Sequence, residues 1–318
     1  MSHATLEAMV RNYLSAERAP CVTWQGGSPT LMGVDFYHLA VEVQAKYRAP
    51  GARPAVNSLQ TEGTSLDESW LPLLTGPGEW MVGLSCDGPT NKSRGIAQHH
   101  YERVTKMLQG AGVGYSLLCV VSRENVDHPR DTVRYLADLA GPFGHTQFIP
   151  AHRAAPGDPD PGPSPKEWEQ FLICVVSTVR DEGLPIVVEN VQTVKDMRRG
   201  QPGSCIYTGC DSYLVVDSDG AVYPCDFAAE PRWWLGNVHR DRLAELVAGP
   251  RMKEFALLKD VPHEDCEDCA ILRICGRGCS WERYLVEESI GSKSPRCEAT
   301  KYLARVATAT FAGVPLAP

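Results

Sequence analysis

Eight of the twelve cysteines gather between positions 205 and 297. Two of them form a Cys-x2-Cys pair, a spacing that puts two thiolates on one turn, where both can reach one metal site. The other ligands would come from distant points of the chain and close a small domain around the site. The eight residues are Cys205, Cys210, Cys225, Cys266, Cys269, Cys275, Cys279 and Cys297.

Eight thiolates can supply two sites of four ligands each. Tetrahedral zinc and iron–sulfur clusters both fit this donor set, and neither the softness of sulfur nor the number of ligands separates them. Disulfides are disfavoured, because the N-terminal stretch has no apolar core of signal-peptide type. We therefore expect a cytoplasmic protein whose clustered cysteines bind metal.

Composition excludes several other classes of protein. The 318 residues carry a formal charge of −8, with 43% hydrophobic and 22% charged residues, as in folded globular proteins. An acidic chain without clustered cations is a poor ligand for phosphates. The apolar runs fall short of the roughly 20 residues needed to span a bilayer. Neither a nucleic-acid partner nor a membrane is expected.

The first half of the chain alternates short apolar runs with helical stretches. The runs predict strands at 21–25, 55–60, 80–85, 117–121 and 145–150. The helical periodicity predicts helices at 4–18, 34–47, 67–74, 97–111 and 129–140. This is the pattern of a parallel α/β sheet or barrel, which places functional groups at the carboxyl ends of its strands. Such a series normally begins with a strand, but here a helix comes first and five strands follow.

Three regions follow from these patterns. Residues 1–153 form the α/β region, and residues 154–200 form a proline-rich linker with a helical connector that includes a helix at 166–182. Residues 201–318 form the cysteine-rich region. Within it, Asp219-Gly220 between two apolar runs predicts a hairpin, and 298–311 predicts a capping helix.

The order of several short motifs carries a resemblance to a known family. The stretches WQGGSPT, NSLQTEGTSL, VGLSCDGP, QFIP and VYPCDF follow one another as in anaerobic sulfatase-maturating enzymes, and the eight cysteines are similar to those of a SPASM domain. The resemblance covers nearly the whole chain. It implies a partial (β/α)6 radical S-adenosylmethionine (SAM) barrel, here without its first strand, followed by a C-terminal SPASM domain.

The resemblance also implies a function. The family oxidises a cysteine or serine of a sulfatase to formylglycine with a 5′-deoxyadenosyl radical, so the cofactors would be SAM and two auxiliary [4Fe–4S] clusters. The partners would be a sulfatase or other peptide substrate and an electron donor. By the same resemblance the first cluster takes Cys205, Cys210, Cys225 and Cys279. The second takes Cys266, Cys269, Cys275 and Cys297.

Further site residues are implied in the same way. Asp226 matches the family's proton acceptor, since a carboxylate beside a cluster can take the proton of a thiol or hydroxyl; the alternative is an ordinary turn aspartate. Gly27 and Ser85 match positions that hold SAM, with ordinary βα-turn chemistry as the alternative. His152 occupies a SAM-contact position that is hydrophobic in the family, and Arg94 is a candidate replacement for a SAM-contacting arginine.

Three departures from the family pattern stand out. No CxxxCxxC motif, whose three thiolates bind the SAM-cleaving cluster, precedes Cys205, so that cluster is expected only if an upstream segment exists. The GGE turn is Gly26-Gly27-Ser28 here, and the QTNG turn is Gln60-Thr61-Glu62-Gly63.

Several interpretations stay open. The chain is a fragment or has a mis-assigned start, or it is a decayed relative, or it is a complete protein that uses its SPASM domain for another purpose. The alternative functions are a radical SAM peptide maturase with another target and a non-catalytic iron–sulfur or zinc-binding module. An in-frame CxxxCxxC encoded upstream of Met1 would favour the enzyme.

Overall fold

The protein is built on a six-stranded parallel sheet, seen in a computed structural model that describes residues 1–15, 17–90, 94–141, 144–155, 157–201, 203–211 and 213–309. The strands follow one another across the sheet in chain order, and each pairs in parallel with the next. They are β1 (Cys21–Trp24), β2 (Val56–Thr61), β3 (Glu79–Ser85), β4 (Tyr115–Val121), β5 (His145–Pro150) and β6 (Val187–Val188). Their carboxyl ends therefore lie along one rim.

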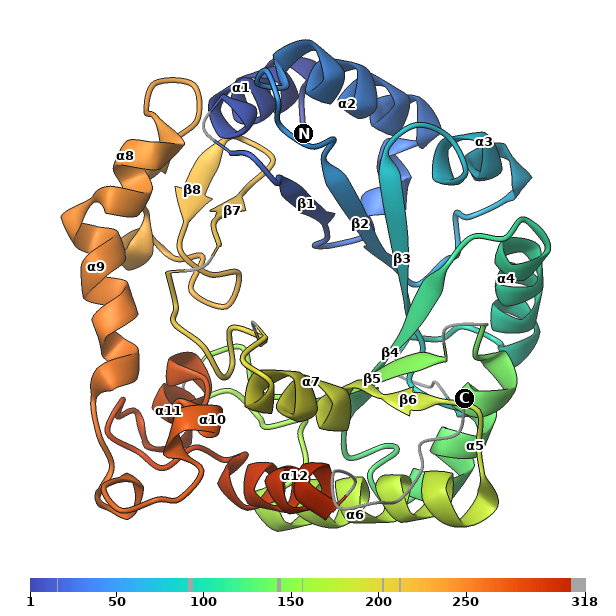
Figure 1. Ribbon diagram of the computed structural model, residues 1–318, viewed down its shortest axis with the longest axis vertical. Helices are drawn as coiled ribbons and strands as arrows, with labels where there is room; N and C mark the ends of the chain where they lie inside the picture. Colours follow the sequence, from blue (N-terminus) through green and yellow to red (C-terminus); the bar gives the residue numbers. More distant parts are fainter. Residues whose placement is uncertain are drawn as a thin grey trace.

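Helices cover the outer face of this curved sheet, as Figure 1 shows. They are α1 (His3–Leu14), α2 (Val34–Tyr47), α3 (Leu71–Leu74), α4 (Gln98–Gly110), α5 (Pro129–Leu139) and α6 (Pro165–Glu182), with 3₁₀ turns η1 (Pro29–Met32) and η2 (Glu68–Trp70). The helix α7 (Glu189–Arg198) follows β6 and packs against α12 and β5. None of the helices within the described ranges is long and apolar enough to cross a bilayer. The apolar faces of helices and strands meet in one large core, where Tyr37 packs edge-on against Trp24 and Trp80.

The expected parallel α/β architecture is confirmed, and the five expected strands match β1 to β5. A sixth strand, β6, is not predicted by the sequence pattern; it has only two residues and pairs with the start of β5. A strand this short carries no alternating pattern that could distinguish it from a loop before a helix. The parallel sheet consequently extends beyond residue 153 into the region expected to be a connector.

The cysteine-rich region has a small antiparallel sheet of β7 (Val215–Val216), β8 (Ala221–Tyr223) and β9 (Gly236–Asn237). The expected hairpin is present, and Gly220 in its turn has a φ of +89°, which favours glycine. The remaining elements are α8 (Leu243–Ala248), α9 (Pro250–Leu257), α10 (Leu272–Cys275), α11 (Ser280–Glu287) and α12 (Cys297–Ala309), with 3₁₀ turns η3 (Pro231–Trp233), η4 (Leu258–Asp260) and η5 (Glu264–Cys266).

This region occupies the gap between the two ends of the curved sheet (Figure 1). On the β1 side, Ala8 of α1 packs with Val222, Val238 and Leu243 in a small apolar cluster. Asn12 of α1 reinforces the contact, because its amide donates to the carbonyl oxygen of Asp241 at 2.7 Å. On the β6 side, α12 packs against α6 and α7. The cysteine-rich region is thus held at both ends of the sheet.

Candidate functional site

The expected SAM-binding positions lie along the rim formed by the carboxyl ends of the strands. Gly27 follows β1 with a φ of +59°, and a Cβ built on it would meet no atom within 4 Å, so the turn is open. Ser85 is the last residue of β3 and is buried, with 6% of its surface exposed. His152 follows β5. The parallel register brings these three positions to the same edge.

The two departures from the family's turn motifs meet on this rim. The hydroxyl of Ser28, after β1, donates to Oε1 of Glu62, after β2, at 2.8 Å. Thr64 donates to the same oxygen at 2.7 Å. Partial burial raises the pKa of Glu62, but the hydrogen bonds from Thr64 and Ser28 and the charge of Arg94 lower it, and the net direction is downward. The carboxylate missing from one turn is therefore present on the neighbouring turn as an anion.

Arg94 forms an ion pair with a carboxylate of the same chain, that of Asp87. Its guanidinium donates from Nε to Oδ2 of Asp87 at 2.7 Å and from a terminal nitrogen to Oδ1 at 3.1 Å. Asp87 lies two residues past β3, is 5% exposed, and also accepts from the backbone of Val120 at 2.9 Å. This fork-to-carboxylate geometry is the strong form of an ion pair. Arg94 is thus placed near the rim, with its fork directed at Asp87.

Asp226 reaches the same rim from the cysteine-rich region. Its Oδ2 accepts from the side-chain amide of Gln25, the residue before the Gly26-Gly27 turn, at 3.3 Å. Its Oδ1 accepts from the hydroxyl of Tyr213 at 3.2 Å. Burial and the neighbouring groups Cys225 and Asp226 raise the pKa of Tyr213, so its hydroxyl stays protonated and can donate. Both oxygens of the exposed carboxylate are therefore oriented by donors.

A ring contact is a second link between the barrel rim and the cysteine-rich region. His152, after β5, lies edge-on to Phe227, with ring centroids 4.6 Å apart. Phe227 directly follows Asp226 in the chain. The residues expected at the SAM site and the expected proton acceptor are consequently brought together from both sides.

Sequence reasoning missed Gln25 and Tyr213. Gln25 stands 201 positions before Asp226, so no local pattern links the two residues. The one available signal for Gln25 was its place at the end of β1, since such residues line the active edge of parallel sheets. For Tyr213 there was no signal beyond its proximity in the chain to the hairpin.

Electrostatic contacts link several of the eight cysteines. Burial, followed by the thiols of Cys297, Cys266 and Cys269, raises the pKa of Cys275 to about 11. Burial raises the pKa of Cys279 to about 12, and Cys225 contributes to that shift. In addition, the sulfur of Cys210 lies 3.7 Å from the hydroxyl of Ser280, beside Cys279.

Which four cysteines share a cluster stays the prediction that the resemblance implied. Within the described ranges, no three His, Cys, Asp or Glu side chains converge on a point suited to one metal ion. Cysteine thiolates are the usual ligands of [4Fe–4S] clusters, so these residues have the donor chemistry that such clusters need.

The four other cysteines are separate from these groups. Cys86 and Cys119 are buried and Cys174 is half-buried, as expected for cysteines that behave as small hydrophobes. Cys21 differs, because it is exposed at the start of β1.

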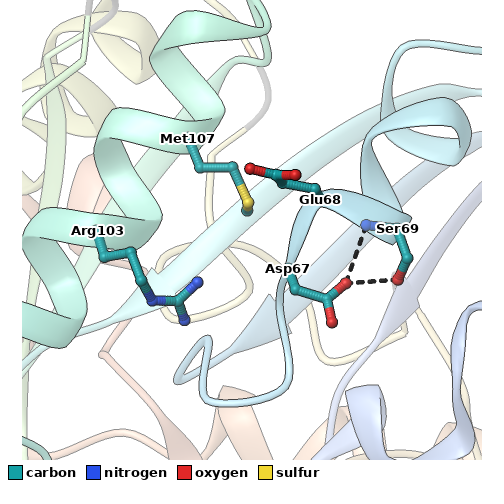
Figure 2. A pocket seen from close by; sticks show the side chains of 5 residues that line it. All are labelled: Asp67, Glu68, Ser69, Arg103 and Met107. Carbon is teal, nitrogen blue, oxygen red and sulfur yellow. Dashed lines mark hydrogen bonds between the residues drawn. The ribbon is translucent and has the colours of Figure 1, made fainter.

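A cavity of about 450 Å³ lies on the outer side of the barrel and is lined by Asp67, Glu68, Ser69, Arg103 and Met107 (Figure 2). Asp67 accepts from the backbone of Ser69 at 2.9 Å and so caps η2, while Arg103 donates to the carbonyl oxygen of Leu66 at 3.4 Å. Asp67 and Arg103 in the cavity wall thus stabilise the η2 turn. The rim at Gln25 and Asp226 remains the candidate site.

Comparisons with known proteins agree with this geometry. Residues 205–270 match the SPASM iron–sulfur cluster-binding domain. A cysteine-type anaerobic sulfatase-maturating enzyme of Clostridium perfringens is 31% identical over 95% of this chain and 85% of its own length. A serine-type anaerobic sulfatase-maturating enzyme of Klebsiella pneumoniae is 29% identical over 88% of this chain and 72% of its own length.

Solved structures extend the likeness to three dimensions. The structure of native anSMEcpe with bound AdoMet superposes with a TM-score of 0.85 at 29% identity, covering 98% of this chain and 89% of that one. Streptococcus suis SuiB bound to the precursor peptide SuiA gives a TM-score of 0.66 at 14% identity, over 92% of this chain and 68% of that one. The second likeness concerns the fold alone.

Proposed function

The chain belongs to the anaerobic sulfatase-maturating enzyme family, and we propose that, when joined to a segment that supplies the SAM-cleaving cluster, it oxidises a cysteine or serine side chain of a sulfatase to formylglycine. The observation that carries this proposal is the hydrogen bond between Gln25 and Asp226. It joins the turn expected to hold SAM to the carboxylate expected to take a proton. Gln25 or Asp226 alone could be an ordinary turn residue. Their contact is what supports a shared role, because it joins the turn proposed for SAM to the proposed proton acceptor.

When bound, SAM and the cluster that cleaves it would supply the radical for hydrogen abstraction at the substrate Cβ, and auxiliary clusters would supply an electron acceptor. The chain's own residues then have a defined task. Asp226 accepts the proton of the substrate thiol or hydroxyl. Gln25 and Tyr213 hold the carboxylate in position by donating to its two oxygens. The exposure of Asp226 leaves it accessible to a peptide.

The rim supplies the SAM contacts in this proposal. The open turn at Gly27 receives the amino-acid end, and the Glu62 carboxylate, held by Ser28, accepts from its ammonium group. Ser85 and His152, at the same edge, would contact the rest of the molecule. Arg94 contributes positive charge near Glu62 while it holds Asp87.

The proposed cluster ligands are the two sets of four cysteines already described. Cys205, Cys210, Cys225 and Cys279 form the first set, beside Asp226. Cys266, Cys269, Cys275 and Cys297 form the second. We propose a peptide substrate and an external electron donor as partners.

The test compares two polypeptides under strictly anaerobic conditions. One is the printed sequence, and the other carries an added upstream segment with the CxxxCxxC motif of the family. Each is reconstituted with iron and sulfide and given SAM, a strong reductant and a sulfatase peptide with Cys or Ser before x-Pro-x-Arg.

The extended polypeptide should release 5′-deoxyadenosine and convert the peptide to formylglycine, which mass spectrometry detects. The printed polypeptide should do neither, because its sequence contains no three-thiolate loop that leaves an iron open to SAM. Deoxyadenosine without any formylglycine from either the Cys or the Ser peptide would contradict the sulfatase proposal.

A further inference from the structure

A lysine side chain is buried between the two groups of cysteines. Lys259, in η4, is only 5% exposed. Its ammonium donates to the carbonyl oxygens of Cys205 and Ile206, at 2.6 and 2.8 Å. These carbonyls belong to the segment that begins the first ligand set. Lys259 therefore ties this segment to the stretch that leads into the second set.

A buried arginine binds the backbone on either side of the lysine. Arg283, in α11, is 1% exposed, and its guanidinium donates to the carbonyl oxygens of Val261 and Ser292 at 2.6 and 2.8 Å. A longer bond of 3.5 Å reaches the carbonyl of Lys259 itself. The arginine thus fixes the backbone that carries the lysine.

These two cations differ from the third buried cation of the region. Arg296 is buried against the carboxylate of Glu282, which balances its charge. The ion pairs found within the described part of the chain include none made by Lys259 or Arg283. A buried cation is costly unless an anion compensates it. Carbonyl oxygens satisfy its hydrogen bonds but do not neutralise the charge.

Cysteines are the acidic groups whose charge acts on both cations. The charge of Lys259 interacts with Cys210, Cys279 and Cys205 of the first set and with Cys275 of the second. Arg283 interacts with Cys266, Cys275 and Cys279, so it also faces both sets. Neutral thiols would not compensate these cations. Thiolates bound to iron carry negative charge, and each electron added to a cluster increases it.

We propose that Lys259, backed by Arg283, is the fixed counter-charge of the auxiliary clusters and raises their reduction potential. A cation held close to a cluster stabilises the more negative, reduced form. The clusters are thereby better acceptors for the substrate's electron. Lys259 touches no reacting atom, so it is a positioning residue, and this inference rests on the ligand sets proposed above.

The experiment measures cluster potentials directly. The printed polypeptide is reconstituted without oxygen, and its clusters are titrated with reductant while electron paramagnetic resonance follows the reduced form. Lys259→Met removes the charge, and Lys259→Arg keeps it. Lys253→Met is the matched control, since Lys253 is exposed on the neighbouring helix α9.

We expect Lys259→Met to bind as much iron as the parent and to shift the first cluster to lower potential, with a smaller shift of the second. Lys259→Arg and Lys253→Met should keep the parent potentials. If Lys259→Met instead loses iron while Lys259→Arg retains it, the requirement for a cation at this site is likewise supported.

Two results would overturn the proposal. One is an unchanged potential in an iron-loaded Lys259→Met protein. The other is equal loss of iron in Lys259→Met and Lys259→Arg, which would make the side chain a purely structural tie. A parent polypeptide that binds no iron would refute the ligand sets instead, so the two failures are distinguishable.

Discussion

Replacing Asp226 by asparagine isolates its role as a proton acceptor. The amide has nearly the same shape, but it carries no negative charge and its nitrogen is a donor rather than an acceptor. One of the two donors, Gln25 or Tyr213, would then face an NH2 group instead of an oxygen. The side chain is exposed, so the lost hydrogen bond should change the free energy of unfolding by only about 1 kcal/mol.

The effect on turnover should be much larger. A positioned general base contributes about 10² to 10⁴-fold, which corresponds to about 2.7 to 5.4 kcal/mol of barrier. Removal of the hydrogen atom from Cβ needs no base, whereas loss of the thiol or hydroxyl proton does. In the extended polypeptide with CxxxCxxC, Asp226→Asn should therefore keep deoxyadenosine release and lower formylglycine formation by about that factor.

The assay counts both products from the same reaction, with iron content measured beside them. Glu230→Gln is the control, because it removes an exposed carboxylate four positions further along and should leave both products unchanged. Full formylglycine turnover in Asp226→Asn would refute the assignment and leave Asp226 as a turn residue. Loss of iron would show instead that the carboxylate orients Cys225.

Three further predictions concern cofactors and stability. The reconstituted printed polypeptide should bind about eight irons with matching sulfide, because four cysteine thiolates hold each [4Fe–4S] cluster, and two zincs without acid-labile sulfide would contradict this. Glu62→Gln should weaken SAM binding to the extended polypeptide about 10- to 100-fold in calorimetry, since a hydrogen bond to a charged group contributes about 1.5 to 3 kcal/mol. The control Glu68→Gln, at the outer cavity, should leave SAM binding unchanged. Glu282→Ala should lower the free energy of unfolding by about 3 to 5 kcal/mol in urea titrations of the iron-free chain, because it leaves the Arg296 guanidinium buried without its partner; a loss below about 1 kcal/mol would contradict that reasoning.

The local elements could be predicted because they depend on local patterns. The helix expected at 34–47 is α2, with the same bounds, since its apolar face repeats at helical spacing. The hairpin at Asp219-Gly220 follows from turn chemistry that involves only neighbouring residues. In contrast, β6 is fixed by pairing with β5, a tertiary contact with almost no local signal.

The site could be predicted in part. The expected positions of Gly27, Ser85 and His152 along one rim follow from strand order and parallel pairing alone. The partner of Arg94 could not be foreseen, because the Asp87 carboxylate is aimed at it by the turn after β3. Nor did the sequence connect Ser28 with Glu62, since two separate departures from a motif become related only when neighbouring strands bring them within 2.8 Å.

The position of Asp226 depends on packing far from the site. The residue is exposed and follows β8, and its direct contact with the barrel is the hydrogen bond from Gln25. What fixes it is the apolar cluster of Ala8, Val222, Val238 and Leu243 on the β1 side, together with the bond from Asn12 to Asp241. The helix α1 also packs on α2 of the barrel, so these contacts fix β8 relative to the barrel. Since β8 leads directly to Cys225 and Asp226, this interface sets the distance between the proposed proton acceptor and the turn proposed to bind SAM.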